Sequence, residues 1–241
     1  MYNVEALKTS GEFVQLRSGL TSKETYRSGD KVLSVIDVSR LASQDKNPLK
    51  MRDFIEDYIS ELKKAGIPVV EIFEIILQGD TIIITTKYHD VFLDAQMALG
   101  DEQFISGVNG ILNALCLIKN CPVGIDPTPK NFAVTEIGIM YADFFYSFCR
   151  SYSEWVRSRM DPENPQHRYI SIVHDYVYNP LVYAHALADF NQLNIFPPDK
   201  TMDLVANHCF YHAPGFDLEY EYNRYLEVKK LAREEMNNYL R

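Results

Sequence analysis

Apolar and polar residues alternate over short stretches in the first 90 positions, which is typical of half-buried strands. Two of the breaks between these stretches, at Gly29-Asp30 and Gly79-Asp80, have the composition of tight hairpin turns. The pattern therefore predicts an antiparallel sheet. Its strands are expected at Glu12–Arg17, Glu24–Arg27, Val32–Val38, Val69–Leu77 and Thr81–Tyr88.

A single helix is expected between the third and fourth of these strands. Met51–Ala65 carries apolar residues three and four positions apart, which places them on one helical face. Gly66 and Pro68 then end the helix. The pattern thus predicts three strands, a helix and two strands for the first part of the chain.

After Asp90 the spacing of the apolar residues becomes helical, with one exception. Pro122–Asn131 contains three prolines and cannot be a regular helix, and a short hairpin of Phe132–Val134 with Ile139–Ala142 follows it. We predict an α+β protein with a sheet lobe at residues 1–90, a linker near Lys87–Asp94 and a helical lobe at residues 91–241. The helices are expected at Asp101–Lys119, Tyr146–Met160, Ile170–Phe190, Thr201–His212 and Leu218–Leu240.

Composition narrows the class of protein. The 241 residues are 46% hydrophobic and carry a net charge of −9, which suits a folded protein and disfavours nucleic-acid binding. There is no apolar signal core and no stretch long enough to cross a bilayer, so we expect a cytoplasmic protein without a membrane partner. The four cysteines lack CxxC spacing, as expected for free thiols in a reducing compartment.

The proline-rich loop carries the most informative side chains. Asp126 and Asn131 are five positions apart outside regular structure, and Asp143 follows the predicted hairpin. Phosphoryl transfer needs a carboxylate to orient and deprotonate the attacking hydroxyl, and oxygen ligands to hold Mg²⁺ on the nucleotide phosphates. These three residues match that requirement.

The same segment resembles the aminoglycoside phosphotransferase and choline-kinase group of the protein-kinase-like superfamily. That group has a catalytic loop of the form H-x-D-x-x-x-x-N, then a hairpin and a D-F-G-like triplet. The resemblance covers roughly residues 12–150 and implies a two-lobed kinase-like fold that uses ATP or GTP with Mg²⁺. It makes Asp126 the catalytic aspartate, and Asn131 and Asp143 the metal ligands.

Further resemblance lies upstream and is weaker. Ser18-Gly19-Leu20-Thr21-Ser22 is similar to the loop that covers the ATP phosphates, which implies nucleotide-binding roles for Ser18, Gly19, Thr21 and Lys23. Glu56 is the first candidate for the glutamate of the ion-pair helix, and Glu61 is the second.

Three departures from the pattern bear on activity. Gly124 stands where histidine is usual, Phe145 ends the triplet in place of glycine, and Ser34 stands where the phosphate-binding lysine is expected. Lys31 is three positions from Ser34, which puts it on the opposite face of a strand. The cations that could take over are Lys23, Lys31 and Arg40.

These features support two main hypotheses. The first is an ATP- or GTP-dependent phosphotransferase acting on a hydroxyl of a small molecule, with a cationic acceptor as one option. A protein acceptor is disfavoured because no A-P-E-type anchor follows Asp143. The second is a pseudokinase that serves as a binding or scaffold module, and nucleotidyl transfer is a third option. The acceptor, the nucleotide and the oligomeric state stay open.

One motif lies outside this scheme. His208 and His212 are four positions apart, a spacing found in zinc sites, but the sequence points to no third ligand. From the sequence we interpret both residues as ordinary core or surface histidines.

Overall fold

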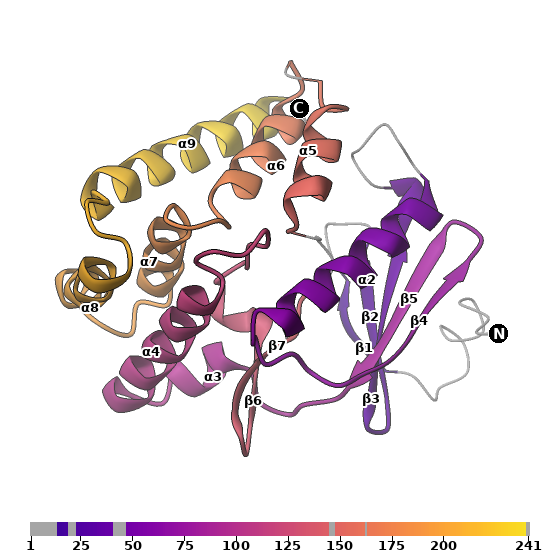
Figure 1. Ribbon diagram of the computed structural model, residues 1–241, viewed down its shortest axis with the longest axis horizontal. Coiled ribbons are helices and arrows are strands. Elements are labelled where there is room, and N and C mark those ends of the chain that lie inside the picture. Colours follow the sequence, from indigo (N-terminus) through magenta and orange to yellow (C-terminus); the bar gives the residue numbers. More distant parts are fainter. Residues whose placement is uncertain (1–13, 19–22, 41–46, 145–147, 162, 240–241) are drawn as a thin grey trace.

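The computed structural model describes residues 14–18, 23–40, 47–144, 148–161 and 163–239. A small antiparallel sheet with one long helix forms the first lobe, and the second lobe is mainly helical (Figure 1). This is the α+β, two-lobed, protein-kinase-like fold that the sequence predicts.

Every neighbouring pair in the five-stranded sheet is antiparallel, and the strand order is β1-β2-β3-β5-β4. Gly29 (φ 59°) and Gly79 (φ 58°) adopt the left-handed backbone that the two tight turns need, which explains glycine at both. The predicted series of three strands, a helix and two strands is confirmed. The strands are β1 (Val14–Ser18), β2 (Lys23–Ser28), β3 (Lys31–Asp37), β4 (Ile72–Gln78) and β5 (Thr81–Lys87).

Helix α2 (Pro48–Lys64) covers one face of this sheet. Asn47 caps it by accepting a hydrogen bond from the Lys50 backbone nitrogen, and Pro48 occupies the first turn, where its missing N–H costs nothing. Its buried residues join the sheet's inner residues Ile36, Ile82 and Ile84 in the main core. The opposite face has a small core of its own, formed by Tyr26, Leu33, Val35 and Ile83.

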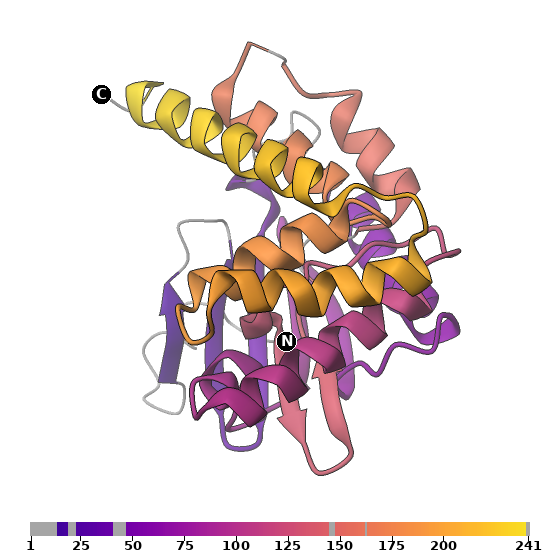
Figure 2. The same ribbon diagram turned by 90° about the vertical axis from the view of Figure 1, so that its left-hand side faces the viewer.

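The helical lobe follows β5, and its last helix packs against two earlier ones (Figure 2). Helix α9 contacts α6 and α7, while α8 contacts α7 and α4. Among the described residues, no helix has both the length and the apolarity needed to cross a bilayer. The helices are α3 (Leu93–Met97), α4 (Asp101–Leu117), α5 (Arg150–Arg157), α6 (Pro165–Asp175), α7 (Val182–Gln192), α8 (Pro198–His212) and α9 (Leu218–Tyr239).

Some predicted helix boundaries were wrong. The segment 170–190 is not one helix: α6 and α7 are separated at residues 176–181, because Pro180 lacks a backbone N–H and pushes its predecessor out of helical geometry. The predicted linker contains the start of α3, a single turn that buries Leu93 and Met97. Helix α5 begins at Arg150, and residues 145–147 lie outside the described part of the chain.

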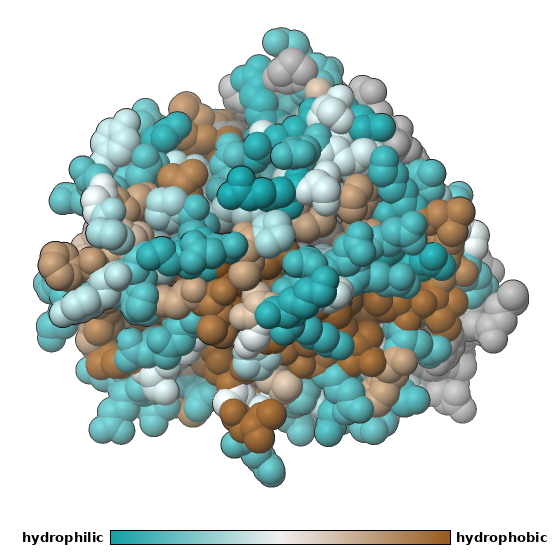
Figure 3. Space-filling view, viewed as in Figure 1, coloured by the Kyte–Doolittle hydropathy of each residue, from teal (hydrophilic) through white to brown (hydrophobic). Residues whose placement is uncertain are grey.

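The predicted hairpin is confirmed as β6 (Phe132–Thr135) and β7 (Gly138–Tyr141). It also joins the lobes, since the Val70 nitrogen donates to the Tyr141 oxygen at 3.0 Å and the Tyr141 nitrogen donates to the Pro68 oxygen at 2.8 Å. One core cluster spans both lobes. The hairpin tip projects from the lower edge of the molecule in Figures 1 and 3. Ile137, in the turn between the two strands, is exposed.

Candidate functional site

The proline-rich loop between α4 and β6 is held in place from three directions. The Gly124 nitrogen donates to the Phe148 oxygen at 2.6 Å, and the Ile125 nitrogen donates to the Val177 oxygen at 3.1 Å. The Tyr58 hydroxyl of α2 donates to the Gly124 oxygen at 2.9 Å. The backbone just before Asp126 is therefore fixed by both lobes.

Packing explains why glycine occupies position 124. A Cβ there would lie 2.5 Å from the Val177 oxygen and 2.8 Å from its Cγ2 atom. The backbone between α6 and α7 fills the space that a side chain would need. The departure from the histidine of the resembling kinases is thus a consequence of this chain's own fold.

The side chain of Asp126 takes part in a local turn with Thr128. Its Oδ1 atom accepts hydrogen bonds from the Thr128 nitrogen at 3.0 Å and from the Thr128 hydroxyl at 2.5 Å. Aspartate followed by proline is well suited to such a turn, because its side chain bonds the backbone two residues on. The Asp126 side chain is 23% exposed, and the hydrogen bonds it accepts within the described residues use Oδ1. Oδ2 is therefore available to an incoming hydroxyl.

A buried charge cluster lies behind Asp126, and the sequence did not point to it. His185 Nε2 is 3.3 Å from Asp189 Oδ2 and 3.9 Å from Asp126 Oδ1. Lys229 Nζ on α9 is 3.5 Å from Asp189 Oδ1, and Thr128 Oγ1 is 2.5 Å from Asp189 Oδ2. Two carboxylates thus face two cationic side chains. The one sequence signal was His185 and Asp189 at helical spacing on the otherwise apolar α7.

The hydrogen bonds of His185 indicate that its ring is protonated. Nδ1 lies 3.2 Å from the Tyr176 carbonyl oxygen, which can only accept, so Nδ1 carries a proton. Nε2 faces two carboxylates and must also donate. Burial alone would lower the pKa of His185, but Asp189 and Asp126 raise it above its usual value.

The pKa of the Asp189 carboxyl group shifts in the opposite direction. Burial alone would raise the pKa of Asp189, but His185, Lys229 and Thr128 together lower it. The ligand atoms of Asp126, His185 and Asp189 lie within 4.8 Å of one another, close enough to surround a cation. Because His185 is protonated and Lys229 already faces Asp189, the cluster is better described as a balanced ion-pair network that fixes the position of Asp126.

The hairpin brings Asn131 next to Asp143. The Ala142 nitrogen donates to the Asn131 oxygen at 2.8 Å, and Asp143 follows directly. Asn131 is 7% exposed, and its Nδ2 atom is buried without a hydrogen-bond partner among the described residues. An unpartnered buried amide is costly unless something else binds there.

The carboxylates of Asp126 and Asp143 both affect the pKa values of two buried tyrosines, Tyr58 and Tyr141. Burial raises the pKa values of Tyr58 and Tyr141, and the negative charges of Asp143 and Asp126 raise both further. Asp126 and Asp143 therefore both act electrostatically on Tyr58 and Tyr141, and their joint role at one site stays a prediction. Mg²⁺ prefers oxygen ligands, and the half-buried Asp143 carboxylate and the side-chain oxygen of Asn131 are groups of that kind.

The residues of the sheet that were candidates for nucleotide binding lie on its two opposite faces. Lys31 is exposed beside the hairpin turn, with Nζ 5.2 Å from the centroid of the Phe73 ring, on the face away from α2. Ser34 lies on the α2 face, since its neighbours Leu33 and Val35 form the core on the other side. The register pairs Ser34 with Thr25 and Lys23 with Ile36. Position 23 therefore shares the α2 face with Ser34, and position 31 does not.

The candidate glutamates do not turn toward the sheet. Glu56 is exposed, with Oε1 3.5 Å from Arg52 Nε on the same helix, and Glu61 pairs with Lys64 at 2.6 Å. Lys31 and Glu56 therefore do not pair: Lys31 lies on the sheet face away from α2, and Glu56 lies beside Arg52 on the exposed side of α2. Gly19, Thr21 and Phe145 lie outside the described residues, as do the side chains of Ser18, Lys23 and Arg40.

No family model matches the chain, and no curated protein matches it. A crystal structure of WbdD aligns with 88% of this chain at 12% identity and a TM-score of 0.42, covering 49% of its own length. A second structure, described as the bifunctional kinase-methyltransferase WbdD, aligns with 84% at 11% identity and a TM-score of 0.39, covering 47%. The chain spans about half the length of either, and similarity at this level decides neither activity nor substrate. The kinase-like fold rests on the element order and sheet topology described above.

Proposed function

We propose that this protein is a phosphotransferase that moves the terminal phosphoryl group of ATP or GTP to a hydroxyl of a small molecule. Its chemistry would follow the aminoglycoside and choline kinases that its loop resembles. The proposal is supported by the Asp126 loop and by the hairpin between Asn131 and Asp143, both of which are hydrogen-bonded to the first lobe.

Asp126 is proposed as the residue that orients the acceptor hydroxyl and accepts its proton. What supports this role is that Oδ1 is held by Thr128 and faces His185, while Oδ2 is available. The cluster of His185, Asp189 and Lys229 would keep the carboxylate in one orientation. Positioning of this kind contributes much of the rate in phosphoryl transfer, because the transition state demands little covalent chemistry from the protein.

Asn131 and Asp143 are proposed to hold Mg²⁺. The cation would neutralise charge on the nucleotide phosphates. Support for these ligands comes from the hairpin, in which Asn131 accepts the backbone hydrogen bond of Ala142 and Asp143 follows directly, and from their oxygen-bearing side chains.

Lys23 is proposed to supply the positive charge that Ser34 lacks. Its support is the strand register, which puts position 23 on the α2 face, two residue pairs away from Ser34. Lys31 has no such support, because it lies on the other face beside Phe73.

A kinase-shaped binding module is the second candidate. It is favoured by Ser34 in the lysine position and by the outward-facing Glu56, since active kinases use a lysine–glutamate pair to hold the phosphates.

Binding calorimetry with ATP and GTP, each with and without Mg²⁺, separates these candidates. Wild type and Asp143→Asn are compared with the matched control Asp57→Asn, an exposed carboxylate on α2. The phosphotransferase proposal expects Mg²⁺-dependent binding in wild type and control, and its loss in Asp143→Asn. Mg²⁺-independent binding that Asp143→Asn retains would favour the binding module, and no binding of either nucleotide would reject the phosphotransferase.

A further inference from the structure

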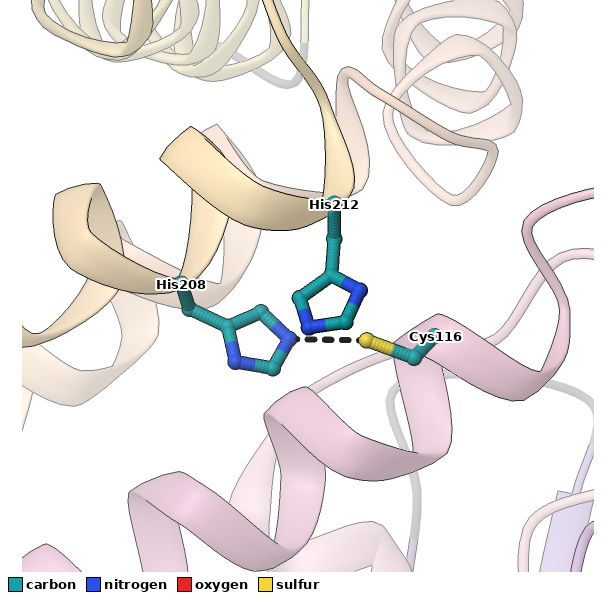
Figure 4. A group of neighbouring side chains, drawn as sticks. All are labelled: Cys116, His208 and His212. Carbon is teal, nitrogen blue, oxygen red and sulfur yellow. Dashed lines mark hydrogen bonds between the residues drawn. The ribbon is translucent and has the colours of Figure 1, made fainter.

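The structure supplies a third partner for the histidine pair on α8. His208 and His212 are one turn apart, with ring centroids separated by 4.4 Å and planes inclined by 30°. Cys116, in the last turn of α4, lies 2.8 Å from His208 Nε2 through its sulfur. Figure 4 shows both imidazole rings directed at this sulfur. The three ligand atoms lie within 4.8 Å of one another.

These separations suit a tetrahedral metal ion. With Zn–N near 2.0–2.1 Å and Zn–S near 2.3 Å, tetrahedral ligands sit about 3.4 Å apart for two nitrogens and about 3.6 Å apart for nitrogen and sulfur. The Cys116–His208 separation would have to open by about 0.8 Å, from 2.8 Å to that value. The change is smaller than the 4.8 Å within which all three ligand atoms lie.

A cysteine–histidine hydrogen bond would account for one of the imidazoles but not for the second. His212 is a turn further along α8 and still directs its ring at the same sulfur (Figure 4). All three residues are partly exposed, so a hydrated cation can reach them and a water molecule can complete the coordination. The group lies between α4 and α8, and it shares no residue with the Asp126 site.

We propose that Cys116, His208 and His212 bind one Zn²⁺ ion, with the fourth position left to water or to an outside ligand. Thiolate and imidazole donors favour Zn²⁺ over Mg²⁺ or Ca²⁺, which prefer oxygen. The ion would join α8 to α4, so its binding should stabilise the helical lobe independently of any nucleotide.

Titration of the full chain with Co²⁺ tests this proposal, because a Co²⁺ ion bound by thiolate gives a sulfur-to-metal absorption band that an all-oxygen site cannot give. Wild type is expected to show the band, saturating at about one equivalent, and Zn²⁺ should abolish it by displacement. Cys116→Ser should lack the band. His212→Ala should weaken Co²⁺ binding by more than ~100-fold, because it removes a ligand rather than a group that orients one.

The matched control is Cys121→Ser, which removes a partly exposed thiol whose sulfur contacts the Leu117 oxygen. It should leave the band unchanged. Circular dichroism verifies folding, and His212→Ala, at a partly exposed position, keeps the test decisive if Cys116→Ser does not fold. No band in wild type would overturn the proposal, as would a band that survives in Cys116→Ser or disappears in Cys121→Ser.

Discussion

Replacing Gly124 by alanine should destabilise the protein even though it adds one methyl group. The new Cβ would meet the Val177 oxygen at 2.5 Å, and ordinary contact requires about 3.4 Å, so that carbonyl must retreat by about 0.9 Å. The same oxygen accepts the Ile125 N–H at 3.1 Å, and this bond would stretch beyond useful length. Overpacking of about 1–3 kcal/mol and a lost hydrogen bond of about 1 kcal/mol give a total of about 2–4 kcal/mol.

Thermal unfolding measures this effect. At roughly 2–4 °C per kcal/mol for a chain of this size, we expect the Tm of Gly124→Ala to fall by about 10 °C. Gly110→Ala in α4 is the matched control, because its Cβ would meet only the end of the Ile139 side chain and alanine favours the helix. The control should be near neutral. A Gly124→Ala variant as stable as wild type would refute the account of the loop.

Three further predictions concern buried groups around the site. Since the folded-state pKa of His185 is raised, its pairing stabilises the protein fully below about pH 6.5 and less as the pH rises through the folded pKa. His185→Gln should abolish that alkaline loss in pH-dependent urea unfolding, and should cost about 1.5–3 kcal/mol at low pH because Asp189 keeps only Lys229 and Thr128 as partners. Burial, with a smaller contribution from Arg157, lowers the pKa of His174 to about 4, so acidification from pH 6.5 toward 4 should cost up to about 3 kcal/mol. His174→Gln should remove this acid sensitivity in the same urea titration, and an unchanged profile would contradict it. Tyr58→Phe removes the donor to the Gly124 oxygen and should cost about 1.5 kcal/mol by calorimetry, whereas an unchanged enthalpy and Tm would argue against that bond.

Local features were predictable because they depend on nearby residues. Strand alternation, the glycine turns and the helix ending at Gly66 follow from period and backbone preference, and all three are present. The spacing of Asp126 and Asn131 was equally local, and the hairpin after them fixes where Asp143 lies.

Features that depend on distant packing were not predictable. His185 reaches Asp126 from α7, and the reason for Gly124 is the Val177 carbonyl, which belongs to the break between α6 and α7. Cys116 is far in sequence from the histidine pair it faces. In each case the partner is set by how helices pack, and no spacing in the sequence encodes it. Glu56 is a different case, because its partner Arg52 lies four residues earlier on the same helix, a spacing that the sequence does show.

Nucleotide consumption tests whether this protein is a phosphotransferase that uses Asp126. ADP formation from MgATP, with a panel of small hydroxyl-bearing acceptors, is compared for wild type, Asp126→Asn and the control Asp57→Asn. We expect turnover by wild type and control, and a loss of about 10²–10⁴-fold in Asp126→Asn with MgATP binding retained. Turnover by Asp126→Asn at the wild-type rate, or none by wild type with either ATP or GTP, would contradict it.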